Sequence, residues 1–77
     1  MKIVVFVNGE KFDLPSDQTT VGDLIKLGKG IPGQYDLEER KGERGPVVHT
    51  YSDPNQTIRV HDGEHFTTKY TGPINPS

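Results

Sequence analysis

The stretch that decides the fold of this 77-residue chain is Ile3-Val4-Val5-Phe6-Val7-Asn8-Gly9-Glu10-Lys11-Phe12-Asp13-Leu14. Its first five residues are β-branched or aromatic, which is typical of a strand. Asn8-Gly9 follows, and both residues tolerate a positive φ, so the sequence predicts a two-residue type I′ turn. Residues 11–14 then alternate polar and apolar side chains, as a half-buried strand does. We therefore expect the chain to open with a β-hairpin.

The two-residue turn also fixes which side chains share a face of the hairpin. The register predicts one apolar core face, made of Ile3, Val5, Phe12 and Leu14. The opposite face carries Val4 and Phe6 as two exposed apolar side chains among charged ones. Because exposed apolar residues on a sheet often mark a protein contact, we interpret Val4 and Phe6, joined by His65 of the last predicted strand, as a partner-binding patch. Single surface hydrophobics are also ordinary in soluble proteins, so that alternative stays open.

A short helix is expected after the hairpin. Thr20 precedes Val21-Gly22-Asp23, the Thr-x-x-Asp pattern of a helix start. Three apolar residues recur at helical spacing on one face: Val21, Leu24 and Ile25. The helix is expected to end near Gly28-Lys29-Gly30, with Pro32 just beyond. Gly22 is expected to allow a close approach of the helix to the sheet.

Further strands are predicted at residues 35–38, 47–51, 57–60 and 65–70, separated by polar turns. The charged run at 38–44 is predicted to be a solvated hairpin end. A hairpin, one helix and then several strands indicate an α+β fold, with a mixed sheet of four or five strands and one short helix packed on one face. Residues 1–70 are predicted to form a single domain, and residues 71–77, with two prolines, a flexible tail.

Composition excludes several classes of function. The net charge of −2 and the scattered basic residues give no drive to bind nucleic acid. The absence of cysteine excludes disulfides and thiolate chemistry and favours a cytoplasmic location. The longest apolar run falls far short of the roughly 20 residues that span a membrane, and the amino-terminal stretch is too short for a signal peptide. Because no Ser/His/Asp set has supporting context, we expect neither an enzyme nor a cofactor.

The three histidines of the chain are candidate metal ligands. His61 and His65 stand four residues apart, the spacing that zinc enzymes place on a helix, and His49 is a third candidate. Asp62-Gly63 between the pair predicts a turn instead of a helix. We therefore expect no metal site.

The order of these elements resembles the ubiquitin-like β-grasp superfamily. Ser16-Asp17 before the Thr20 cap resembles the start of the ubiquitin helix, Lys29-Gly30-Ile31-Pro32 resembles its exit, and Tyr35-Asp36-Leu37 stands where the next strand begins. The ending, Gly63-Glu64-His65-Phe66-Thr67-Thr68, is similar to that of bacterial ubiquitin-like proteins of the multiubiquitin-domain type. The resemblance covers residues 1–72.

The resemblance implies a ubiquitin-like protein modifier of a bacterial conjugation pathway. Its partners would be activating enzyme, conjugating enzyme and JAB-type peptidase homologues and a target protein, and some operons of this kind act in defence against phage. Thr71-Gly72 stands at the place of the conjugated end. The usual Gly-Gly is absent, and Pro73 follows Gly72, so residues 73–77 would have to be removed by cutting a Gly-Pro bond.

Two alternatives remain on the same fold. If the chain is not a modifier, we expect a non-conjugated interaction module or one unit of a tandem ubiquitin-like protein. In the tandem protein the residues from Gly72 onward would be a linker. A sulfur carrier is disfavoured because it needs a Gly-Gly thiocarboxylate end.

Overall fold

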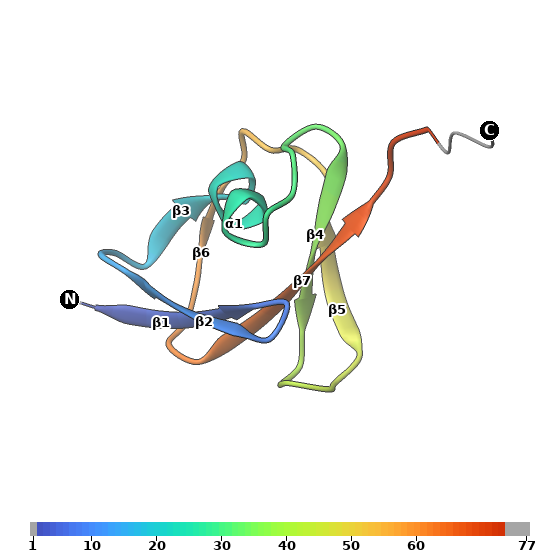
Figure 1. The fold of residues 1–77 in the computed structure, drawn as a ribbon. Coiled ribbons are helices and arrows are strands. Elements are labelled where there is room, and N and C mark those ends of the chain that lie inside the picture. Colours follow the sequence, from blue (N-terminus) through green and yellow to red (C-terminus); the bar gives the residue numbers. More distant parts are fainter. Residues whose placement is uncertain (1, 74–77) are drawn as a thin grey trace.

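The computed structural model describes residues 2–73, which fold into two sheets and a helix (Figure 1). In chain order the elements are β1 (Ile3–Val7), β2 (Glu10–Leu14), β3 (Gln18–Thr20), α1 (Val21–Leu27), β4 (Tyr35–Arg40), β5 (Val47–Tyr51), β6 (Thr57–Arg59) and β7 (Glu64–Tyr70). The main sheet has five strands in the order β2-β1-β7-β4-β5, and β3 pairs with β6 in a second, two-stranded sheet.

The main sheet is mixed. β1 and β7 run parallel, whereas β1–β2, β4–β7 and β4–β5 are antiparallel. The first and last strands of the chain therefore lie side by side in the middle of the sheet, and α1 lies over one face of it (Figure 1). This is a β-grasp-like α+β arrangement, and it confirms the fold class predicted from the sequence.

The amino-terminal hairpin has the predicted register, with Val5 opposite Phe12 and Phe6 opposite Lys11. Asn8 has φ 53° and Gly9 has φ 84°, the two positive values that a type I′ turn requires. The Asn8 side chain also reaches β7: its amide nitrogen donates to Thr68 Oγ1 at 3.0 Å, and its oxygen accepts from Thr68 N at 3.0 Å. The turn is thereby fastened to the last strand.

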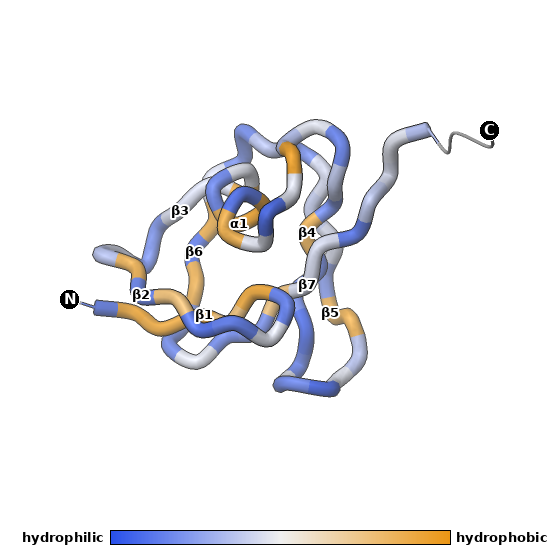
Figure 2. Tube along the Cα trace, viewed as in Figure 1, coloured by the Kyte–Doolittle hydropathy of each residue, from blue (hydrophilic) through white to orange (hydrophobic). Residues whose placement is uncertain are grey.

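The core lies between α1 and the main sheet. Buried apolar side chains come from both sheets and the helix, and no buried side chain among the described residues is charged; the core consists of Ile3, Val5, Val7, Val21, Leu24, Ile25, Leu37, Ile58, Val60 and Phe66. Figure 2 shows orange apolar segments in both α1 and β1. Phe12 and Leu14 of the predicted core face are only half-buried, because β2 is an edge strand.

Thr20 caps α1 as predicted, since its Oγ1 accepts a hydrogen bond from Asp23 N at 3.1 Å. Gly22 was expected to let the helix approach the sheet, but the segment that it lets approach is a different one. Gly22 N donates to Pro54 O at 2.8 Å, and a Cβ at position 22 would stand 2.9 Å from that oxygen. The glycine therefore admits the loop before β6, not the main sheet. α1 has seven residues, and within residues 2–73 no helix is long and apolar enough to cross a membrane.

The second sheet was not predicted. Gln18–Thr20, just before the predicted helix, forms β3 and pairs antiparallel with β6, Thr19 lying opposite Ile58. This pairing carries Ile58 into the core beside the start of α1. Two strands also end at residues other than those predicted: β6 ends at Arg59, and β4 continues through Arg40.

Removing the Thr20 hydroxyl should destabilise the protein. We expect Thr20→Ala to lower the free energy of unfolding by about 1 kcal/mol, because an orphan amide at the start of α1 loses its acceptor. Thr20→Ser keeps the oxygen and is the matched control. Urea denaturation followed by circular dichroism measures both, and equal losses in the two variants would contradict a capping role for the hydroxyl.

Candidate functional site

The chain leaves the body at the end of β7, where Thr71 is anchored. Thr71 N donates to Gln34 O at 2.8 Å, and Thr71 Oγ1 donates to the same oxygen at 3.2 Å. Next to this anchor the ring of Tyr70 meets the ring of Tyr35 edge-on, with centroids 5.3 Å apart. The loop between α1 and β4 therefore sets the direction in which the tail departs (Figure 1).

The tail bends back over Gly72. The Tyr70 hydroxyl donates to Pro73 O at 2.9 Å, and a Cβ at position 72 would stand 2.5 Å from that hydroxyl. We call Tyr70, Gly72 and Pro73 the tail hook. The flexible tail predicted from the sequence begins at Thr71, which is hydrogen-bonded to Gln34, and residues 74–77 lie outside the described part of the chain.

The predicted patch lies on the sheet face away from α1. Phe6 and His65 are paired across β1 and β7, and their rings stack with centroids 4.5 Å apart and an interplanar angle of 7°. Val4 shares this face two residues along β1, where its amide donates to Asp62 Oδ1 at 2.7 Å. All three side chains are half-buried, so the expectation of two exposed apolar side chains is wrong; the His65 ring stacks on Phe6. The structure brings the predicted residues together on one face of the sheet.

A polar network continues this face toward β4. Arg40 Nε donates to Thr67 Oγ1 at 2.9 Å, and Thr67 Oγ1 donates to Glu38 Oε1 at 3.0 Å. Arg40 also lies 3.6 Å from the Glu38 carboxylate and pairs with His65 across the strands. The prediction that residues 38–44 form a solvated hairpin end is thus wrong for residues 38–40, which are half-buried in β4. Fixed side chains at Glu38, Arg40 and Thr67 give the face a defined pattern of charge.

A second charged cluster lies on the opposite face of the sheet, and the sequence did not reveal it. Burial raises the pKa of Glu64, and hydrogen bonding and charge repulsion from Glu39 raise it further, while the His61 amide, which donates to Glu64 at 2.8 Å, opposes the rise. Burial and the Glu39 carboxylate also raise the pKa of the Tyr51 hydroxyl, which donates to Glu39 at 3.1 Å. Glu64 is the first residue of β7, directly after the Asp62-Gly63 turn. The sequence around it does not indicate that a carboxylate of β4 lies nearby.

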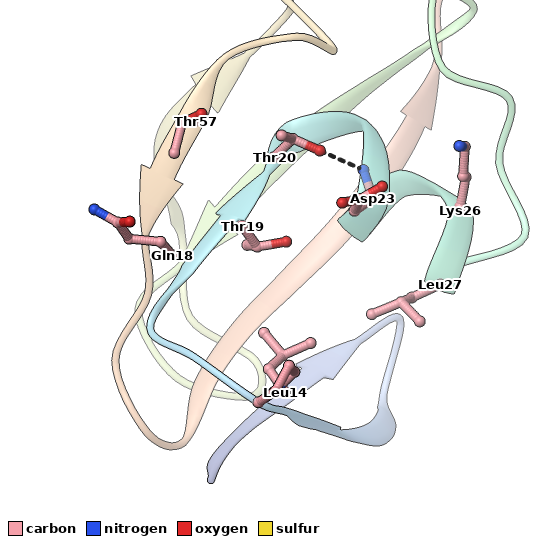
Figure 3. Close-up of a pocket in the computed structure, with 9 residues that line it drawn as sticks. Leu14, Gln18, Thr19, Thr20, Asp23, Lys26, Leu27 and Thr57 are labelled. Carbon is pink, nitrogen blue, oxygen red and sulfur yellow. Dashed lines mark hydrogen bonds between the residues drawn. The ribbon is translucent and has the colours of Figure 1, made fainter. Parts of the chain in front are cut away.

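A groove opens beside α1, on a side of the molecule that the predicted patch does not reach. Its volume is about 610 Å³. Figure 3 shows Leu14 and Leu27 at one end of the groove and Thr19, Thr20 and Asp23 along its wall. The lining is mainly apolar, and Thr20 is already bonded to the backbone of Asp23. The groove has no set of groups for a reaction, and none of the predicted site residues lines it.

The three histidines do not converge. His49 lies on β5 against Tyr51, His61 precedes the Asp62-Gly63 turn, and His65 stacks on Phe6. Within residues 2–73 no three His, Cys, Asp or Glu side chains gather where they could hold a metal ion.

The geometry defines a β-grasp-like domain with a stacked patch on one sheet face and a hooked tail at the end of its central strand. No family model, curated protein or solved structure matches the chain. The resemblance to ubiquitin-like proteins therefore rests on the residues and the fold alone.

The Glu39–Glu64 pair predicts a pH-dependent gain from removing one charge. A raised pKa in the folded state means that the stability contributed by protonated Glu64 is complete below its unfolded pKa, near the ordinary value of 4.5, and is lost as the pH rises through the folded value. We expect Glu64→Gln to raise the free energy of unfolding at pH 7 by up to about 1 kcal/mol, and this gain to vanish near pH 4.

Chemical denaturation of both proteins across this pH range measures the gain. Glu10→Gln removes the same charge at the exposed start of β2 and controls for net charge. A gain at Glu64 no larger than that at Glu10 would show that burial and Glu39 do not act on this carboxyl.

Proposed function

We propose that the protein is a ubiquitin-like modifier of a bacterial conjugation pathway, joined to its targets through Gly72 after residues 73–77 are removed. One observation carries this proposal: β7, held between β1 and β4 in the middle of the sheet, leads directly through Thr71 to Gly72 at the margin of the body. A rigid central strand presents this segment at a fixed place, which suits entry of a slim chain end into another protein's active site.

The chemistry would belong to the partners. A JAB-type peptidase homologue would hydrolyse the Gly72–Pro73 bond, water supplying the oxygen of the new Gly72 carboxylate and the proton of the departing proline amine. An activating enzyme would join the carboxylate to AMP from ATP with release of pyrophosphate. A conjugating enzyme would then carry Gly72 as an energy-rich ester until a target nucleophile displaces it. The chain itself supplies the side-chain-free end and the docking surface.

The docking surface in this proposal is the patch of Val4, Phe6 and His65. The rings of Phe6 and His65 are nearly parallel and partly open to solvent, and the residues that alternate with them on β1 and β7 are buried in the core. The Arg40–Thr67–Glu38 network beside it adds fixed charge, which gives a partner orientation as well as contact area.

The proposal predicts a covalent adduct. Incubating the protein with cognate activating and conjugating enzyme homologues, the peptidase homologue and ATP should yield an adduct on intact mass spectrometry, lost when Gly72 is deleted together with the residues after it. Phe6→Ala should slow adduct formation about 10-fold, the effect expected when a central aromatic contact is truncated. Val48→Ala, an exposed apolar truncation on β5, is the matched control. Equal rates for the Phe6 and Val48 variants would contradict docking through the patch.

The tail hook favours a second candidate, a non-conjugated interaction module. A Cβ at position 72 would stand 2.5 Å from the Tyr70 hydroxyl, so a larger residue would require the Tyr70 ring to shift, and the glycine suits the hook without any conjugation. In that case the patch binds a partner without any covalent step.

The hook should also delay cleavage, because peptidases bind their substrates as extended chains. We expect Tyr70→Phe to raise the rate of cutting between Gly72 and Pro73 by about 2- to 10-fold, since one hydrogen bond no longer holds Pro73 back. Tyr35→Phe removes a hydroxyl from the neighbouring ring and is the control. Cleavage followed by mass spectrometry decides: an unchanged rate would show that the hook does not guard this bond, and no cleavage in either variant would favour the interaction module.

A further inference from the structure

The two edges of the main sheet differ in chemistry. Strand β2 carries three charged residues, Glu10, Lys11 and Asp13, whereas β5 carries none. β5 is also open to solvent along most of its length, with Val48 53% exposed and Val47 38% exposed. Its apolar beginning lies at the rim of the sheet in Figure 2. Native edges are usually guarded by charge, because unpaired backbone groups there accept a strand from another chain. On β5 that guard is missing.

A β-bulge protects only the first part of β5. Arg40 pairs with Val47 and Glu39 with His49, so Val48 is an extra residue without a partner on β4. From His49 to Tyr51 the pairing is regular, each residue facing one residue of β4. The regular half of the strand therefore presents an ordered and uncharged edge whose middle residue is Thr50.

We propose that two copies of this chain associate by antiparallel pairing of their β5 strands about a two-fold axis at Thr50. The axis places Thr50 opposite Thr50, and His49 opposite Tyr51 of the second copy, twice. Threonine pairs and aromatic pairs are among the favourable cross-strand combinations. Because the pairing is self-complementary, one edge serves both copies, as a two-fold interface requires.

Charge at the two ends of β5 complements this arrangement. The turn before the strand, residues 41–45, carries two basic residues and one acidic residue, and Asp53 follows the strand. Antiparallel pairing brings the turn before one strand beside the end of the other. With the axis at Thr50, Asp53 of each copy lies opposite Val47 of the second copy, three residues along the chain from Arg44 of the net positive turn, and a chain charge of only −2 opposes association weakly.

The association is expected to be weak, because a short strand ladder buries far less surface than a permanent dimer interface. A dissociation constant on the order of 100 µM is typical of such small contacts. Sedimentation velocity of the full chain from low to millimolar concentration should show a reversible rise from monomer to dimer.

Charge substitutions at Thr50 test the axis directly. Thr50→Lys places two like charges opposite each other, and Thr50→Asp does the same with the other sign, so each variant alone should weaken dimerisation at least 10-fold. An equal mixture of the two should restore dimers, because lysine then faces aspartate. Glu10→Lys changes a charge on the other edge strand and should leave the concentration dependence unaltered. Circular dichroism checks that each variant is folded.

A cysteine variant supplies an independent measurement, since the chain has no cysteine of its own. Under mild oxidation Thr50→Cys should form an intermolecular disulfide much faster than Glu10→Cys, because Cβ atoms of directly opposed residues approach disulfide distance. A wild-type chain that stays monomeric to about 1 mM, well above the affinity expected of this contact, would overturn the proposal. Equal crosslinking at positions 50 and 10 would do the same, and so would binding of an extended peptide along β5 with no self-association.

Discussion

The parallel pairing of β1 with β7 is the contact on which the rest of this structure depends. It brings together two strands from opposite ends of the chain, placing Val7 beside Phe66 and Phe6 beside His65. Parallel neighbours cannot be joined by a tight turn, so everything between them has to travel over the sheet and back, and α1 makes that crossing possible. The core, the stacked patch and the point where the tail leaves the body are all set by this one register.

Features carried by neighbouring residues could be predicted from the sequence. The Asn8-Gly9 turn dictates a register, and alternation along the strands then decides which side chains face the core. The Thr20 cap depends on a residue three positions away, so it too is legible in the chain. The placement of Val4, Phe6 and His65 on one face follows from the same alternation along the first and last strands.

What escaped prediction depends on partners that are distant in sequence or on side-chain direction. β3 has only three residues, and its strand character comes from β6, some 40 positions later. Glu39 and Glu64 lie close together because β4 pairs with β7. The residues around each of them do not predict that the other one is its neighbour. The tail hook needs the Tyr70 side chain to lie along the residues that follow it, where its hydroxyl reaches Pro73 O and its ring also meets Tyr35. The patch of Val4, Phe6 and His65 is thus readable from local sequence patterns, whereas the Glu39–Glu64 pair and the tail hook depend on the arrangement of the folded chain.

The two hydrogen bonds between the Asn8 side chain and Thr68 make the fold sensitive to deamidation of Asn8. An asparagine before glycine deamidates more readily than most. The backbone nitrogen of the following residue attacks the side-chain carbonyl of asparagine to close a succinimide ring, and glycine has no side chain to hinder this attack. In the folded protein the Asn8 side chain is held from both ends by Thr68. Conversion to aspartate would keep the acceptor for Thr68 N but remove the donor to Thr68 Oγ1. Deamidation would therefore remove one of the two side-chain hydrogen bonds that hold the hairpin turn to the last strand.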